Sequence, residues 1–263
     1  MVTPLATSNY PVNPAAVARP WQAMRCATLC AVALLAPRLA AAAEWNIDPV
    51  RVQLSPEHQT AAVIVRNDSD QPSSLQIQAV VWSQVDGQDV YTPTRELLVS
   101  PPVVTIAPKS DQVIRVALRR QADATRELSY RINLQELPVQ PSPEFTGVQV
   151  ALRIGLPVFV QSQKSEARPE MVWSVSRMPD NVLKVGVRNQ GNAHVQISDF
   201  ALYSPGSDQP ITGEAGSRYV LAGQSQQWLL KTSAAAKLAD GRLRLKAYTD
   251  ADTIDTDLVL GKP

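Results

Sequence analysis

Residues 148–160 read VQVALRIGLPVFV. In the first half of this stretch, polar or small residues alternate with four branched apolar ones: Val148, Val150, Leu152 and Ile154. This period of two puts the four apolar side chains on one face of an extended strand. We therefore predict a β-strand over residues 148–154. Such a strand can complete the protein's own core, or it can lend its apolar row to another protein.

The first 43 residues differ from the rest of the chain. Arg19 and Arg25 precede an apolar run over residues 26–36, and the small residues 40–43 follow it. This order is typical of a secretory signal peptide, and the run is about half as long as a membrane-spanning helix. We expect residues 1–43 to be a signal peptide cleaved at its end or one or two residues earlier; an uncleaved membrane anchor is the alternative.

Both cysteines, Cys26 and Cys30, lie in the expected signal peptide, so the exported chain can form no disulfide and must rely on its hydrophobic cores. The formal net charge is +1. No basic block indicates a nucleic-acid partner, and no later apolar run indicates a membrane span. The remaining length suits two domains of ordinary size.

Most segments after Glu44 alternate or are rich in β-branched residues, and clusters of Asn, Asp, Pro, Gly and Ser separate them. The clearest predicted strands are residues 61–67, 74–82, 112–119, 129–137, 185–189, 194–203, 227–231 and 242–248. Many short strands with regular turns predict an all-β sandwich or barrel.

Two stretches of the chain resemble each other: VIVRNDSDQPSSLQIQ (63–78) and VGVRNQGNAHVQIS (185–198). Each reads as a strand, an Arg-Asn pair, a polar turn and a second strand with a Gln-Ile pair. Two related β-sandwiches in tandem explain the repeat; chance similarity of two strand-turn-strand units is the alternative. We predict four segments: a signal peptide over 1–43, an N-terminal domain over 44–162, a polar linker over 163–169 and a C-terminal domain over 170–263.

The sequence contains no catalytic or metal-binding pattern that we can identify. His58 and His194 have no metal-ligand spacing, and the motifs of serine hydrolases, phosphate loops and zinc proteases do not occur. The acidic run TDADTIDTD (249–257) lacks the glycine and terminal glutamate of an EF-hand, so we interpret it as a solvated polar loop. We expect a binding protein without catalytic residues, metal or cofactor.

An ordered series of segments resembles the periplasmic pilus-assembly chaperones of the chaperone–usher family. Residues 48–82 are similar to the family's opening strands, and residues 100–119 to its double-proline segment and arginine-bearing strand. RELSYRINLQELP (126–138) is similar to its Arg-Glu, aromatic, Asn and closing Pro signature, and residues 148–160 take the place of the strand used in subunit capture. The last segment and VLAGQSQQW (220–228) look most like the archaic branch.

The resemblance implies two immunoglobulin-like sandwiches in tandem, set at an angle with a cleft between them. It also implies donor-strand complementation in the periplasm: the chaperone lends a strand to a pilin-like subunit with an incomplete immunoglobulin fold and delivers it to an outer-membrane usher. The groove-filling side chains would be Val148, Val150, Leu152 and Ile154. An exposed apolar edge also favours self-association of the free chaperone.

The resemblance further implies which charged residues bind the subunit. Arg51 matches a first-strand arginine that holds the subunit's terminal carboxylate, and a guanidinium can grip a carboxylate with two parallel hydrogen bonds. The family's partner lysine falls at Pro157, so either Arg153 supplies the second cation or Arg51 works with backbone N–H groups. Glu127 and Asp240 match the interdomain charge cluster.

Two other classes of function remain as alternatives. The first is a secreted structural β-sandwich protein, either a pilus subunit or an adhesin; the absence of cysteines after the expected signal peptide argues against a subunit. The second is an enzyme or carbohydrate-binding module, which would need clustered carboxylates or exposed aromatic residues. With five Trp, six Tyr and three Phe and no evident aromatic cluster, the sequence shows no such site.

Overall fold

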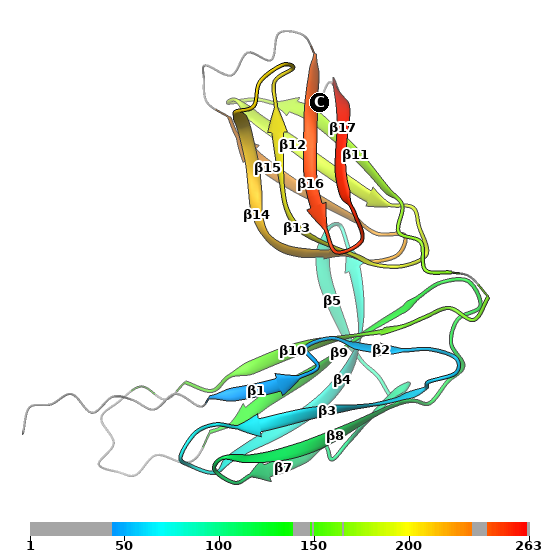
Figure 1. Ribbon diagram of the computed structural model, residues 1–263, viewed down its shortest axis with the longest axis vertical. Coiled ribbons are helices and arrows are strands. Elements are labelled where there is room, and N and C mark those ends of the chain that lie inside the picture. Colours follow the sequence, from blue (N-terminus) through cyan, green and yellow to red (C-terminus); the bar gives the residue numbers. More distant parts are fainter. Residues whose placement is uncertain (1–43, 139–147, 149, 165, 233–240, 262–263) are drawn as a thin grey trace, which may run out of the picture. The chain divides into compact units, whose positions relative to one another are not determined.

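The computed structural model describes residues 44–138, 148, 150–164, 166–232 and 241–261 (Figure 1). Every regular element among these residues is a β-strand, so the predicted all-β fold is confirmed. Within this part of the chain, no helix is long and apolar enough to cross a membrane. The expected signal peptide and Asp240 lie outside the described residues.

Two sheets form the first sandwich. The four-stranded sheet has the order β1 (Trp45–Asp48), β3 (Thr60–Asn67), β8 (Ser110–Leu118) and β6 (Leu97–Ser100). The other sheet has the order β2 (Val52–Leu54), β10 (Arg153–Val160), β9 (Leu128–Leu137), β4 (Ser73–Val85) and β5 (Gln88–Pro93), and β7 (Val103–Ile106) pairs with β4. Alternation along each strand sends one row of side chains into a shared core: Val63 and Val65 of β3 are buried, whereas Ile64 between them is exposed.

The second sandwich consists of strands in the order β14 (Pro210–Val220), β13 (Val195–Tyr203), β16 (Arg242–Thr249), β17 (Thr253–Gly261), β11 (Met171–Met178), β12 (Val182–Asn189) and β15 (Ser225–Lys231). Its core is separate from the first and contains Trp173, Phe200 and Trp228. Trp173 and Trp228 stack with their ring centroids 6.1 Å apart.

The acidic run over residues 249–257 corrects one prediction. Only residues 250–252 form a turn, because Thr249 ends β16 and β17 starts at Thr253 and pairs with β16 (Figure 1). Asp255 therefore lies on a strand, where it accepts hydrogen bonds from Arg244 Nε and Nη2 at 2.6 and 2.5 Å. The cross-strand arginine keeps the pKa of the Asp255 carboxyl below its ordinary value. The interpretation of this run as a solvated loop is thus wrong for its second half.

The two Arg-Asn pairs of the sequence repeat place equivalent buried asparagines in the two sandwiches. Asn67 Nδ2 donates to the carbonyls of Gln71 and Ile106, and its Oδ1 accepts from the N–H of Ser69. The counterpart in the second sandwich, Asn189, repeats the arrangement: Nδ2 donates to two carbonyls and Oδ1 accepts from the N–H two residues later. Both asparagines are 0% exposed. The repeat is therefore a structural one, in which a buried amide ties a turn to a more distant strand.

Candidate functional site

The apolar row of residues 148–160 passes from solvent into the core of the first sandwich. Val148 and Val150 are 85% and 72% exposed, and Leu152 is 37% exposed. Ile154 is partly buried against the core, and Leu156 is 4% exposed. The N-terminal part of the row thus projects from the protein, while its C-terminal part fills the protein's own sandwich.

Strand β10 begins later than the sequence predicts, at Arg153 rather than Val148. Its partner β9 ends at Leu137, and the register that pairs Arg153 with Gln135 would place Pro138 opposite Val150. Proline has no N–H to donate, so the ladder cannot continue. Only one further contact pair, Leu152 with Glu136, lies beyond Arg153. Val148, Val150 and Ala151 lie outside the strand, so the strand starts later than predicted, although the predicted apolar face continues into β10.

The second edge of β10 is largely open. Strand β2 pairs with β10 in parallel only over Val158–Val160. Among the described residues, no strand pairs with the same edge of β10 over residues 153–157. Backbone groups alternate between the two edges of a strand, so only about half of the N–H and carbonyl groups of this segment face the open edge and are available to an added strand, and Pro157 has no N–H to offer.

Arg51 lies between β1 and β2 and contacts three side chains of the second sandwich. Its Nη1 donates to Asp250 Oδ2 at 2.7 Å, and its Nη2 donates to Tyr219 Oη at 2.9 Å and to Gln196 Oε1. Burial alone would lower the pKa of the guanidinium, but its interactions with Asp250 and Tyr219 leave that pKa raised above its ordinary value. The side chain is 26% exposed, so Arg51 is a partly accessible cation already paired with a carboxylate.

Arg153 is exposed and lies on the face of β10 opposite the apolar row. The structure gives it no hydrogen bond or ion pair to a described residue, and no contact brings it to Arg51. Arg131 of β9 lies opposite Pro157 in the ladder. This cation was not among the predicted site residues. The Arg131 guanidinium lies 4.3 Å from the ring centroid of Trp82 and donates from Nη1 to Tyr91 Oη at 2.8 Å.

Glu127 also faces the second sandwich. One of its carboxylate oxygens, Oε1, accepts from the backbone N–H of His194 at 3.0 Å and lies 2.7 Å from Nδ1 of the same residue. The His194 ring stacks on Phe159, with 3.4 Å between the centroids and 6° between the planes. The family resemblance predicted a role for Glu127, whereas no feature of the sequence predicted one for His194.

A small cluster connects the two sandwiches next to this pair. Trp82 and Phe159 of the first sandwich pack with Leu221 and Tyr219 of the second. Gln84, which is 3% exposed, donates from Nε2 to the carbonyl of Tyr219 at 2.9 Å and accepts from the N–H of Leu221 at 3.1 Å. The sequence did not predict this cluster, because nothing local to these residues marks a contact with segments that are distant in the chain.

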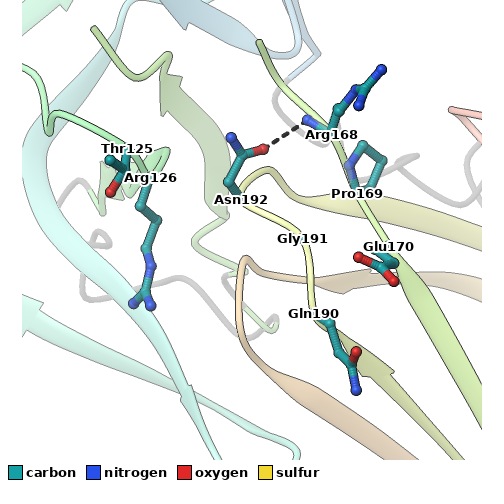
Figure 2. A pocket seen from close by; sticks show the side chains of 8 residues that line it. All are labelled: Thr125, Arg126, Arg168, Pro169, Glu170, Gln190, Gly191 and Asn192. Carbon is teal, nitrogen blue, oxygen red and sulfur yellow. Dashed lines mark hydrogen bonds between the residues drawn. The ribbon is translucent and has the colours of Figure 1, made fainter. Parts of the chain in front are cut away.

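A recess of about 630 Å³ opens beside the loops that precede β9 and β11 and the turn that follows β12. It is lined by Thr125, Arg126, Arg168, Pro169, Glu170, Gln190, Gly191 and Asn192. Figure 2 shows the Arg168 N–H donating to Asn192 Oδ1, at 2.7 Å, while the guanidinium groups of Arg126 and Arg168 point away from each other. In the described part of the chain, no group of three or more His, Cys, Asp or Glu residues could hold a metal ion. The recess therefore has no common ligand site built from its two cations.

The fold and the projecting row together define a protein of two immunoglobulin-like sandwiches, with an apolar strand that extends beyond its own core. Residues 44–165 match the model of the family described as "Pili and flagellar-assembly chaperone, PapD N-terminal domain". The resemblance to pilus chaperones predicted from the sequence is confirmed. The family consists of chaperones rather than enzymes, and the match supports a chaperone role in pilus assembly.

Solved structures of chaperones share the fold. A chain of the CsuC–CsuE chaperone–tip adhesion subunit complex, from archaic chaperone–usher Csu pili of Acinetobacter baumannii, matches with a TM-score of 0.63 and 19% identity over 84% of this chain and 99% of that chain. A chain of the Salmonella enterica SafA pilin–SafB chaperone complex matches with a TM-score of 0.56 and 16% identity over 84% and 98%. The CupB2 chaperone of Pseudomonas aeruginosa matches with a TM-score of 0.52 and 19% identity over 82% and 100%.

At these identities the similarity shows the two-sandwich architecture, and the predicted immunoglobulin-like fold is confirmed. Among curated proteins, no sequence matches the chain.

Proposed function

We propose that this protein is a periplasmic chaperone that folds and caps pilus subunits and delivers them to an outer-membrane usher. The observation that carries the proposal is the apolar row that leaves the core at Leu156 and projects through Leu152 to Val148, beside an open strand edge. The archaic-like sequence of this segment supports membership of the archaic branch.

The projecting segment can supply the two features of a missing strand that an incomplete immunoglobulin fold needs. Its free backbone groups can extend a sheet, and its alternating apolar side chains can fill the groove left by a missing strand. Burial of each side chain contributes about 1.5–3 kcal/mol before the costs of association and ordering are subtracted. Val148, Val150 and Leu152, together with the partly buried Ile154, therefore supply enough apolar surface for a stable but transferable complex.

Arg51 is proposed as the anchor of the subunit's terminal carboxylate. A carboxylate that reached Arg51 would meet a guanidinium whose Nη1 is already bound to Asp250, so it would replace or share that partner. Arg153, which is exposed on the face of β10 opposite the apolar row, is proposed as the second cation of this anchor. Glu127 and Asp240 are proposed as members of the cluster that joins the two domains, which extend over 44–162 and 170–263.

Co-expression tests the proposal. The protein is produced in the periplasm of a bacterial host together with a secreted pilin-like chain that lacks its last immunoglobulin strand, and the complex is isolated through a tag on the chaperone. We expect a soluble one-to-one complex that yields fibres when membranes bearing the matching usher are added. A subunit that aggregates equally with and without the protein would contradict the proposed function.

A further inference from the structure

Glu136 makes a bond to the projecting segment that a backbone carbonyl would ordinarily make. The N–H of Leu152 donates to Glu136 Oε2 at 3.2 Å, and the N–H of Glu136 donates to the carbonyl of Leu152 at 2.8 Å. The register of β9 and β10 places these two residues opposite each other, one position beyond the last ladder pair of Arg153 with Gln135. The Glu136 side chain thus completes the final pair of the sheet.

The carboxylate is itself held in place. Ser73 of the neighbouring strand β4 donates from Oγ to Glu136 Oε1 at 2.8 Å, so the two carboxylate oxygens bind one partner on each side. The bond to Oε2, at 3.2 Å, is longer than the backbone bond of the same pair, at 2.8 Å, so the side chain adds to a contact that the backbone already makes. Leu152 is therefore held in place by β9, although that strand ends at Leu137 and a proline follows it.

We propose that Glu136 is a positioning residue that sets the point at which the lent segment leaves the sheet. The proposal rests on the proposed function. A slip of one residue in a strand turns every side chain to the opposite face. Glu136 fixes both the N–H and the carbonyl of Leu152. It thereby keeps the exposed side chains of Val148 and Val150 in register with Ile154, so that they fit the groove of a partner.

Two variants and one control test this role. Glu136→Ala removes the acceptor, Glu136→Gln keeps a neutral acceptor, and Glu166→Ala removes a carboxylate whose side chain is exposed. Hydrogen exchange of the Leu152 amide is measured on the free protein, and the dissociation constant is measured for the pilin-like chain used in co-expression. Circular dichroism establishes that each variant is folded.

We expect Glu136→Ala to speed exchange at Leu152 and to weaken subunit binding, each by roughly tenfold, the factor for the loss of one hydrogen bond to a charged group. Glu136→Gln should recover most of both effects, and Glu166→Ala should show neither. Unchanged exchange in Glu136→Ala would overturn the inference, and so would faster exchange with unchanged binding. If the unmodified protein binds no subunit, the proposed function fails, whereas the exchange result still decides whether Glu136 orders Leu152.

Discussion

Asn67 and Asn189 show why one short pattern occurs twice in this chain. Each side chain is fully buried, donates to two carbonyls and accepts from at least one backbone N–H, so replacement leaves several backbone groups without partners. We predict that Asn67→Ala and Asn189→Ala each lower the free energy of unfolding by about 2–4 kcal/mol. Chemical denaturation of the two variants measures this.

The two asparagine variants also serve as controls for each other. Asn67→Ala should speed hydrogen exchange mainly in the strands of the first sandwich, and Asn189→Ala mainly in those of the second, because the cores are separate. A loss below about 1 kcal/mol for either variant, the average value for a single hydrogen bond, would show that the buried amide is replaceable by water.

Arg51 allows a second prediction at the residue scale. Arg51→Ala removes the proposed anchor and should sharply reduce the amount of co-purified subunit, while the free energy of unfolding falls only by about 1–3 kcal/mol because the ion pair is partly solvated. Asp250→Asn is the matched control, since it weakens the same contact but leaves the guanidinium. Normal subunit yield with Arg51→Ala would remove the anchor role.

Strand β10 provides a test at the scale of an element, because one apolar row serves two purposes along its length. Leu152 is 37% exposed and Leu156 is 4% exposed, although both are leucines on the same face. We predict that Leu152→Ala changes the free energy of unfolding by less than about 1 kcal/mol but weakens subunit binding. The matched variant Leu156→Ala should cost about 2–5 kcal/mol of stability, as buried leucines do.

These two leucine variants are compared by thermal unfolding and by co-purification of the subunit. A further variant, Leu152→Asp, should abolish capture while the protein stays folded. If Leu152→Asp captured subunits normally, another strand would be the one that is lent.

The strands themselves were predictable, because alternation and turn residues are local signals. Residues 61–67, 74–82, 129–137 and 242–248 all lie within strands of the structure. The start of β10 was not predictable in the same way: it depends on where its partner β9 ends, and the proline that ends the ladder lies in another segment. A pattern within one strand reports which face is apolar, but not how far its neighbour extends.

The candidate site shows the same difference between local sequence signals and contacts that depend on tertiary packing. The apolar row was visible in the sequence, and Arg51 followed from the family resemblance. The partners of Arg51 could not be predicted from the sequence, because Asp250 and Tyr219 lie in the second sandwich and approach Arg51 only in the folded protein. His194 has neither a motif nor a ligand spacing, and its stacking on Phe159 follows from tertiary packing alone.

At the scale of the whole molecule, the described contacts between the sandwiches include a partly exposed set around Arg51 and a buried set around Gln84. Gln84 is central among them, because it binds the carbonyl of Tyr219 and the N–H of Leu221 while also donating to Asp89 at 3.0 Å. An alanine at this position would leave the Leu221 N–H without a partner in a region from which water is excluded. The two sandwiches would then be joined by the packing of Trp82 and Phe159 and by the contacts of Arg51 and Glu127.

We therefore predict that Gln84→Ala uncouples the unfolding of the two sandwiches. The unmodified protein should unfold in coincident transitions when exchange is followed in β9 and in β12, because buried contacts link the two cores. In the variant, the two transitions should separate, with a loss of about 1–3 kcal/mol at the junction from the unpaired groups. Gln53→Ala, at an exposed position on β2, is the control and should leave the transitions coincident. Coincident transitions in Gln84→Ala as well would contradict the prediction and mean that the remaining contacts, those of Arg51, Glu127 and the aromatic cluster, are enough to couple the sandwiches.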